Sequence, residues 1–164
     1  MQLESGKGEI MQTAIVILIA EDDEGHAVLI QKNLRRAGIT NQILHFKDGQ
    51  ETLDFLFRTG PGLHRLSKTP YLLLLDIRMP KVDGIEVLKK IKQDKELKKL
   101  PVTMITTTDD PREVEKCHRL GCSNYITKPV DYESFIEATR KLGLFLSVIQ
   151  IPVINGEGAT SDGH

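Results

Sequence analysis

Residues 71–91 read YLLLLDIRMPKVDGIEVLKKI and combine two hydrophobic patterns. The run at 71–75 is short and apolar throughout, which is typical of a strand buried on both faces of a sheet. From Ile85 onward, apolar residues recur roughly every three to four positions, as on one face of a helix. Asp76 stands between the two patterns. The stretch therefore predicts a buried strand, an acidic loop and an amphipathic helix in succession.

The same order of strand and helix repeats on both sides of this stretch. Further short apolar runs lie at 14–20, 42–46, 101–106 and 124–127. Between the runs, apolar residues recur at helical spacing: Ala27, Ile30, Leu34 and Ala37; Leu53, Leu56 and Phe57; and Ile85, Leu88 and Ile91. A last helix is predicted over 132–149, with Phe135, Ile136, Thr139, Leu142, Leu146 and Ile149 on one face. This alternation predicts a doubly wound α/β fold with a five-stranded parallel sheet and helices on both faces.

The helix before the run at 124–127 has the clearest predicted ends. Asp110 is the expected N-cap, Pro111 follows in the first turn, and Glu113 completes a capping-box pattern. Gly121 is expected to end the helix.

Length and composition favour a single domain. The 164 residues suffice for one buried core, and we expect a leader over 1–12, one domain over 13–152 and a flexible tail over 153–164. Lys and Arg number 22 against 23 Asp and Glu, so no overall field draws the chain to nucleic acid or to an anionic membrane. The longest apolar run is too short for a membrane span, and Cys117 and Cys122 are expected to be free thiols. We expect a cytoplasmic protein.

Chemically active side chains follow the predicted strands. Glu21-Asp22-Asp23 follows the first run and Asp76 the third, whereas the fourth and fifth end in Thr106-Thr107-Thr108 and Thr127-Lys128-Pro129. Ligands of doubly wound folds bind outside the carboxyl ends of the strands. Neighbouring carboxylates repel each other unless a cation compensates, and oxygen ligands without His or Cys favour Mg²⁺.

These groups are the components of phosphoryl transfer to a carboxylate. Asp76 would be the nucleophile, as in other aspartyl-phosphate chemistry. Mg²⁺, Lys128 and the Thr106 hydroxyl would stabilise the charge on the phosphoryl oxygens. The sequence therefore predicts a phosphoacceptor site.

The same residues resemble the receiver domains of response regulators, the CheY-like superfamily. The similarity rests on Glu21-Asp22, the stretch 76–84, Thr106 and Lys128-Pro129, in that order along most of the chain. It implies a flavodoxin-like (βα)5 fold with strand order 2-1-3-4-5. It also implies a signalling protein of a two-component phosphorelay, rather than an enzyme, that takes its phosphoryl group from a histidine kinase.

The resemblance assigns a role to each matching residue. Asp76 would be phosphorylated, and Asp22, Asp76 and the backbone carbonyl of Arg78 would bind Mg²⁺ directly, with Glu21 acting through water and Asp23 at most supporting. Lys128 would bind the phosphoryl group and precede a cis peptide bond to Pro129. Thr106 would be the switch hydroxyl and Tyr125 its aromatic partner, which couples phosphorylation to an output surface.

Two stretches depart from the family pattern. Residues 59–70 make the connection into the third strand unusually long, and we expect an exposed surface loop. Thr107 replaces the small residue common at that position and could slow access to Asp76.

The C-terminal part resembles the single-domain response regulators that serve bacterial phytochrome kinases. The last predicted helix carries more apolar residues than one core contact requires, including Leu144, Phe145 and Val148 away from its main stripe. No DNA-binding or enzymatic output domain is expected after it. We expect a bacteriophytochrome as the cognate kinase and a homodimer through the C-terminal helix and tail.

Two other functions remain open at this point. One is a receiver-like adaptor that binds partners without phosphorylation, which the intact acid pair, Asp76, Thr106 and Lys128 count against. The other is an aspartyl-phosphate phosphatase, whose nucleophile is followed two residues later by an acid/base Asp. Arg78 occupies that position here, which counts against turnover.

Overall fold

The computed structural model describes residues 15–128, Glu133, Glu137, Arg140 and residues 153–154. The elements are β1 (Val16–Ala20), α2 (Glu24–Arg36), β2 (Ile43–Phe46), α3 (Gly49–Phe57), β3 (Thr69–Leu75), α4 (Gly84–Gln93), the 3-10 helix η1 (Leu97–Lys99), β4 (Val102–Thr106), α5 (Pro111–Leu120), β5 (Asn124–Thr127) and β6 (Val153–Ile154). Five parallel strands have the order β2-β1-β3-β4-β5, which confirms the predicted doubly wound sheet.

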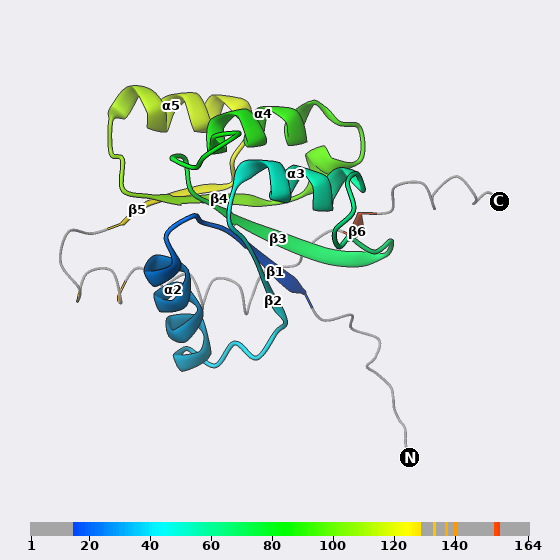
Figure 1. Cartoon of the computed structure of the whole chain (residues 1–164). Coiled ribbons are helices and arrows are strands. Elements are labelled where there is room, and N and C mark those ends of the chain that lie inside the picture. The colour runs from blue at the N-terminus through cyan, green and yellow to red at the C-terminus, as the bar shows by residue number, and fades with distance from the viewer. Residues whose placement is uncertain (1–14, 129–132, 134–136, 138–139, 141–152, 155–164) are drawn as a thin grey trace, which may run out of the picture.

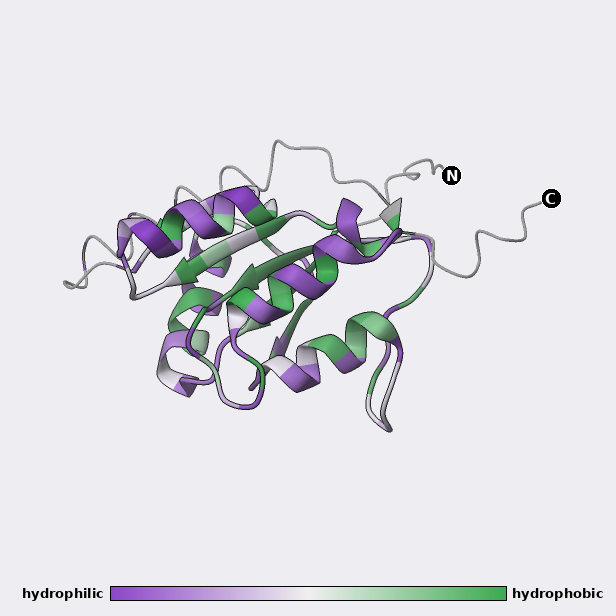
Figure 2. Ribbon diagram, turned by 90° about the horizontal axis from the view of Figure 1, so that it is seen from above, coloured by the Kyte–Doolittle hydropathy of each residue, from purple (hydrophilic) through white to green (hydrophobic). Residues whose placement is uncertain are grey.

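Helices cover both faces of this sheet. Figure 1 shows α3, α4 and α5 on one face and α2 on the other. The first face holds the larger apolar cluster, which includes Phe55, Leu73 and Leu88, and the second packs Ile30 and Leu34 of α2 against Ile19. Along β3 every residue from Pro70 to Leu75 is buried, as expected for a central strand. The green apolar bands in Figure 2 follow these strands and the sheet-facing sides of the helices.

Four helices begin at an aspartate that caps them. The side chains of Asp23, Asp48, Asp83 and Asp110 each accept a hydrogen bond from a backbone N–H of the first turn. This arrangement satisfies donors that the helix itself leaves unpaired. For α5 the predicted ends are confirmed, with Gly121 left-handed at φ 109°.

The capping box predicted for α5 is wrong in one part. Asp110 Oδ1 accepts from the N–H of Arg112 at 2.9 Å, one residue earlier than the pattern requires. The carboxylate of Glu113 does not return to the cap, because it accepts from the Thr108 hydroxyl at 2.9 Å and lies 3.6 Å from Arg78 Nη2.

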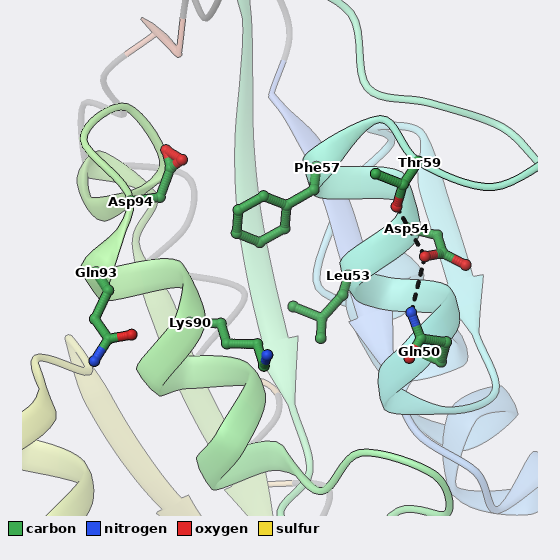
Figure 3. Close-up of a pocket in the computed structure, with 8 residues that line it drawn as sticks. All are labelled: Gln50, Leu53, Asp54, Phe57, Thr59, Lys90, Gln93 and Asp94. Carbon is green, nitrogen blue, oxygen red and sulfur yellow. Dashed lines mark hydrogen bonds between the residues drawn. The ribbon is translucent and has the colours of Figure 1, made fainter.

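Phe57 was predicted to face the core, and the structure contradicts this. Phe57 is 37% exposed, whereas Phe55 is 1% exposed and packs with Phe46 and Tyr71 at ring-centroid distances of 5.0 and 5.6 Å. Figure 3 shows Phe57 and Leu53 of α3 at a hollow of about 520 Å³ that Lys90 of α4 also lines. The aromatic contact of Phe55 therefore sets the rotation of the helix.

The long connection before β3 is mostly exposed, as predicted, but it is anchored at Arg65. Leu63 and Leu66 do face solvent, at 64% and 66% exposure, but Arg65 is buried. Its Nε donates to the carbonyl of Leu56 at 2.7 Å and ties the connection to the end of α3. The strand itself begins at Thr69, two residues before the predicted run.

The C-terminal boundary also needs correction. Val153 and Ile154 were assigned to a flexible tail, but they form β6, which pairs antiparallel with Pro70 and Thr69 of β3. Ile154 is fully buried in the larger core cluster, and this burial favours the pairing.

Part of the last predicted helix falls within the described residues. Glu133, Glu137 and Arg140 are helical and exposed. The apolar stripe of that helix, the expected dimer contact and the predicted cis bond at Pro129 lie outside the described residues.

Candidate functional site

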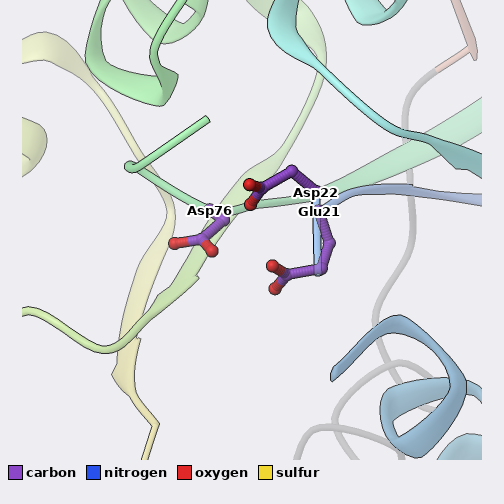
Figure 4. Close-up of side chains that lie close together, drawn as sticks. All are labelled: Glu21, Asp22 and Asp76. Carbon is purple, nitrogen blue, oxygen red and sulfur yellow. The ribbon is translucent and has the colours of Figure 1, made fainter. Parts of the chain in front are cut away.

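Three carboxylates meet at the carboxyl edge of the sheet. Glu21 and Asp22 follow β1, and Asp76 follows the neighbouring strand β3. Each offers an oxygen to a group whose members lie within 4.8 Å of one another. Figure 4 shows the three side chains gathered at this edge. Glu21 and Asp76 are 1% and 5% exposed, whereas Asp22 is exposed. The predicted acid cluster is therefore present and mostly buried.

Lys128, which follows β5, brings a positive charge into this cluster. Its Nζ donates to Glu21 Oε1 and, at 3.3 Å, to Asp76 Oδ2. Burial raises the pKa of Glu21 to about 7, although the hydrogen bond from Lys128 opposes the rise. Glu21 and Asp76 accept from this ammonium group, and Asp22 adds a third carboxylate beside them, so the cluster has room for further positive charge.

Two buried oxygens of the site have no hydrogen-bond partner among the described residues. They are Asp76 Oδ1 and Thr106 Oγ1, and Thr106 is 0% exposed at the end of β4. Leaving a buried polar atom unpaired costs about 1–3 kcal/mol, and such atoms are uncommon in folded proteins. An unpaired carboxylate oxygen beside two further carboxylates fits a hard cation such as Mg²⁺.

The loop after Asp76 is held by close backbone contacts. Gly84 donates its N–H to the carbonyl of Ile77 at 2.7 Å, and a Cβ at residue 84 would lie 2.0 Å from the carbonyl oxygen of Asp76. A Cβ at Gly49 would lie 1.8 Å from the carbonyl oxygen of Val82. Only glycine allows these approaches, so the two glycines fix the loop that carries Arg78.

Arg78 lies beside the acid cluster. It lines a hollow of about 350 Å³ together with Asp22, Asp83 and Glu113. Its side chain is 66% exposed and pairs with Glu113, and its backbone carbonyl as a metal ligand remains a prediction.

The predicted switch residues lie on the neighbouring strands β4 and β5. The Tyr125 hydroxyl donates to the carbonyl of Thr108 at 2.9 Å, and burial raises the pKa of Tyr125 to about 12. Tyr125 is half-buried and Thr107 is exposed. The movement that would couple Thr106 to Tyr125 remains a prediction.

His26 was missed by the sequence analysis and lies at the site. Its Nδ1 is 3.0 Å from Lys128 Nζ, and its backbone N–H donates to the side chain of Asp23. Asp23, expected to support the acid pair, is the N-cap of α2 and donates its own N–H to Glu21 Oε2 at 3.2 Å. A histidine in the first turn of an amphipathic helix carries no local signal of this contact.

Comparison with known proteins identifies the family. A model of the response regulator receiver domain matches residues 17–140. The chain is a response regulator receiver domain. Receivers act in two-component signalling, where their partners are histidine kinases.

Two curated relatives cover most of this receiver. It is 35% identical over 131 residues to the probable methanogenesis regulatory protein FilR2 of Methanothrix harundinacea, covering 80% of this chain and 83% of FilR2. It is 32% identical over 138 residues to the response regulator Rcp1 of Synechocystis, covering 84% of this chain and 92% of Rcp1.

Solved structures show the same fold. A receiver domain from Rhodospirillum rubrum is 46% identical with a TM-score of 0.80, covering 86% of this chain and 99% of its own. The Mn²⁺-bound form of Rcp1 is 30% identical with a TM-score of 0.74, covering 84% and 98%. The phosphorylated cyanobacterial phytochrome response regulator RcpA is 29% identical with a TM-score of 0.76, covering 85% and 99%. Metal binding and phosphorylation are properties of those two proteins.

Within the part of the chain that the structure describes, no helix combines the length and the apolar character that crossing a membrane requires.

Proposed function

We propose that this receiver accepts a phosphoryl group on Asp76 from a phosphohistidine of a histidine kinase, with Mg²⁺ as cofactor. The observation that carries the proposal is the buried Asp76 carboxylate, whose Oδ1 has no partner among the described residues while Oδ2 is 3.3 Å from Lys128 Nζ. A buried carboxylate nucleophile beside the Lys128 ammonium group and two further carboxylates is suited to phosphoryl transfer. The same arrangement contributes little to the stability of the fold.

The chemistry assigned to these residues is one displacement at phosphorus. An oxygen of Asp76 forms a bond to phosphorus, and the bond from phosphorus to the donor nitrogen breaks. The electron pair of that bond stays with the leaving imidazole, and the product is an aspartyl phosphate. Lys128 stabilises negative charge on the phosphoryl oxygens without supplying a proton.

Mg²⁺ would be held by Asp22, Asp76 and the carbonyl of Arg78, with Glu21 through water, and would neutralise further phosphoryl charge. The carboxylate oxygens within 4.8 Å of one another and the unpaired Asp76 Oδ1 support this assignment. The Mn²⁺-bound form of its relative Rcp1 also supports it.

Output would depend on Thr106 and Tyr125. The unpaired Thr106 hydroxyl is free to bind a phosphoryl oxygen, and its movement would release space beside β5 for the Tyr125 ring. The contact from Tyr125 to Thr108 supports an unphosphorylated state in which the half-buried ring is held against the loop that follows β4. Such a change alters protein contacts rather than chemistry, as expected of a cytoplasmic signalling protein.

The proposed kinase is a bacteriophytochrome, and the proposed assembly is a homodimer through the C-terminal helix and tail. Similarity to Rcp1 and to the phytochrome response regulator RcpA supports the kinase class. Phosphotransfer from a purified, phosphorylated bacteriophytochrome kinase should be faster than from an unrelated kinase. Gel filtration with and without a phosphoryl donor tests the dimer, which a monomer under both conditions at high concentration would rule out.

The phosphoacceptor itself is tested by intact mass after incubation with acetyl phosphate and Mg²⁺. We expect an alkali-labile phosphoryl adduct on the wild type and none on Asp76→Asn. Asp109→Asn, which changes an exposed acid of the loop before α5, is the matched control and should keep the adduct. A folded wild type that forms no adduct at any Mg²⁺ concentration would contradict the proposal and favour an adaptor that works without phosphorylation.

A further inference from the structure

His26 lies at the boundary between the buried site and solvent. Its side chain is 41% exposed, against 4% for Lys128. The backbone of His26 is fixed in the first turn of α2, because its N–H donates to Asp23 Oδ1 at 3.0 Å. The ring is thereby directed at the ammonium group, with Nδ1 at 3.0 Å from Lys128 Nζ and 3.9 Å from Glu21 Oε2.

An ammonium group has three N–H donors and no acceptor. Around Lys128 Nζ the described residues supply three acceptors: Glu21 Oε1, Asp76 Oδ2 and His26 Nδ1. Because lysine can only donate, a hydrogen bond between the two groups requires His26 Nδ1 to be the acceptor. The three acceptors come from β1, β3 and α2, so the ammonium group is held from three elements.

The three acceptors differ in charge. Glu21 and Asp76 compensate the positive charge of Lys128, whereas a neutral imidazole holds the ammonium group and leaves its charge available. When a phosphoryl group arrives at Asp76, the contact of Lys128 with Asp76 must give way to a phosphoryl oxygen. A flexible four-carbon side chain loses rotamer freedom when it is fixed, so contacts that persist through the reaction lower the cost of positioning.

We propose that His26 is a positioning residue for Lys128, whose ammonium group it holds by accepting a hydrogen bond at Nδ1. Its kinetic role rests on the proposed function of Asp76. His26 touches neither the phosphoryl group nor the carboxylate of Asp76 in this assignment; it acts through Lys128. Without the His26 acceptor, the Lys128 ammonium group keeps its hydrogen bond to Glu21. It is then displaced from the phosphoryl group that transfers to Asp76.

Phosphorylation kinetics test this role with two variants of His26, one expected to slow the reaction and one expected to restore it. In His26→Leu, phosphorylation by acetyl phosphate at saturating Mg²⁺ should be slower by about tenfold, equivalent to about 1.4 kcal/mol. His26→Asn should restore most of the rate, because its side-chain oxygen can take the place of Nδ1. Lys32→Leu, an exposed change on the same helix, is the control and should keep the wild-type rate. Equal rates for His26→Leu and wild type, or equally slow Leu and Asn variants, would overturn the proposal.

A second measurement detects the contact without any phosphorylation. The ¹⁵N chemical shifts of the His26 ring in the full chain should show a hydrogen-bonded Nδ1 and a protonated Nε2. In Lys128→Met the Nδ1 signal should move to the position of an unbound nitrogen. If the wild type forms no adduct, the proposed function fails, whereas a shift that responds to Lys128→Met still supports the positioning contact. A shift that does not respond would overturn it whatever the kinetics show.

Discussion

Strand β3 has different surroundings at its two ends. Its carboxyl end leads into Asp76, where carboxylates and Lys128 are buried together and two oxygens lack partners among the described residues. Its amino end at Thr69 and Pro70 is paired with β6, and Lys68 donates its N–H to the carbonyl of Ile154 at 3.3 Å. Polar groups at the carboxyl end therefore leave hydrogen bonds unmade, whereas those at the amino end form hydrogen bonds with β6.

The two ends of β3 therefore contribute to different properties: the carboxyl end to reactivity and the amino end to stability. Unpaired buried polar atoms cost free energy, and such sites persist when the surrounding structure is stable enough to bear that cost. Apolar burial at the amino end, including Ile154 at 0% exposure, contributes to that stability. Substitutions at the two ends should therefore have different consequences for unfolding and for phosphorylation.

The largest effect on stability is expected at the amino end. Ile154→Ala should lower the free energy of unfolding by about 3 kcal/mol, because it removes buried methyl groups and leaves a cavity. Phosphorylation of the folded variant should be unchanged. Urea denaturation measures the loss, and Leu66→Ala at 66% exposure is the control, with less than about 0.5 kcal/mol expected. Equal losses for the two variants would show that β6 does not stabilise the domain.

At the carboxyl end, Gly84→Ala should affect both properties. The added methyl group would meet the backbone of Asp76, so we expect a loss of about 2 kcal/mol and a displaced phosphoacceptor with slower adduct formation. Gly62→Ala, where an added Cβ meets nothing within 4 Å, should change neither. Thermal unfolding and intact mass on both variants measure this, and a Gly84→Ala protein with wild-type stability and rate would refute it.

Thr106 and Thr103 form a matched pair on β4, since both are fully buried and their hydroxyls have no hydrogen-bond partner among the described residues. Valine has a similar shape without the hydroxyl, so each Thr→Val change should raise the free energy of unfolding by about 1 kcal/mol. Only Thr106→Val should impair the response to phosphorylation, measured as binding to the kinase or as dimerisation. Loss of stability in Thr106→Val would mean that its hydroxyl has a partner, and impairment by both variants would remove the distinction between them.

At neutral pH the smallest effect is expected at Tyr125, whose contribution to stability should be lost only in alkaline solution. Burial favours the neutral phenol and raises its pKa to about 12, whereas an unfolded tyrosine ionises near ~10. The stability that this group contributes is complete below about pH 10 and is lost as the pH rises towards about 12. Tyrosinate absorbance of wild type minus Tyr125→Phe measures the transition, and the same difference in urea should fall near ~10. A native transition at the unfolded value would contradict the expected burial.

Much of the fold could be predicted because each strand and helix carries its own local pattern. The runs predicted at 42–46, 101–106 and 124–127 needed little correction, and Asp110 and Gly121 were found at the ends of α5. β6 could not be predicted, because two residues pair with a strand more than eighty positions earlier and no local periodicity records that contact. Phe57 was misplaced because its neighbour Phe55 is equally apolar, and only contacts with β2 and β3 distinguish them.

The candidate site was predictable for a different reason. Parallel strands place their carboxyl ends at one edge, so Glu21, Asp76 and Lys128 had to converge once the sheet was inferred. His26 is not at a strand end, and its contact depends on the direction in which α2 leaves Asp23. The sequence could not indicate which oxygens would remain unpaired, because this depends on distances between three strands.

The pairing of β6 with the start of β3 has a practical consequence for surface-based sensing. β3 has seven residues, so about 20 Å of extended strand separates residue 154 from the phosphoacceptor edge. A tether attached at residue 153 would therefore immobilise the receiver at the edge of the sheet opposite the phosphoacceptor site. A sensor chip built in this way would leave the entrance to Asp76 open to the kinase.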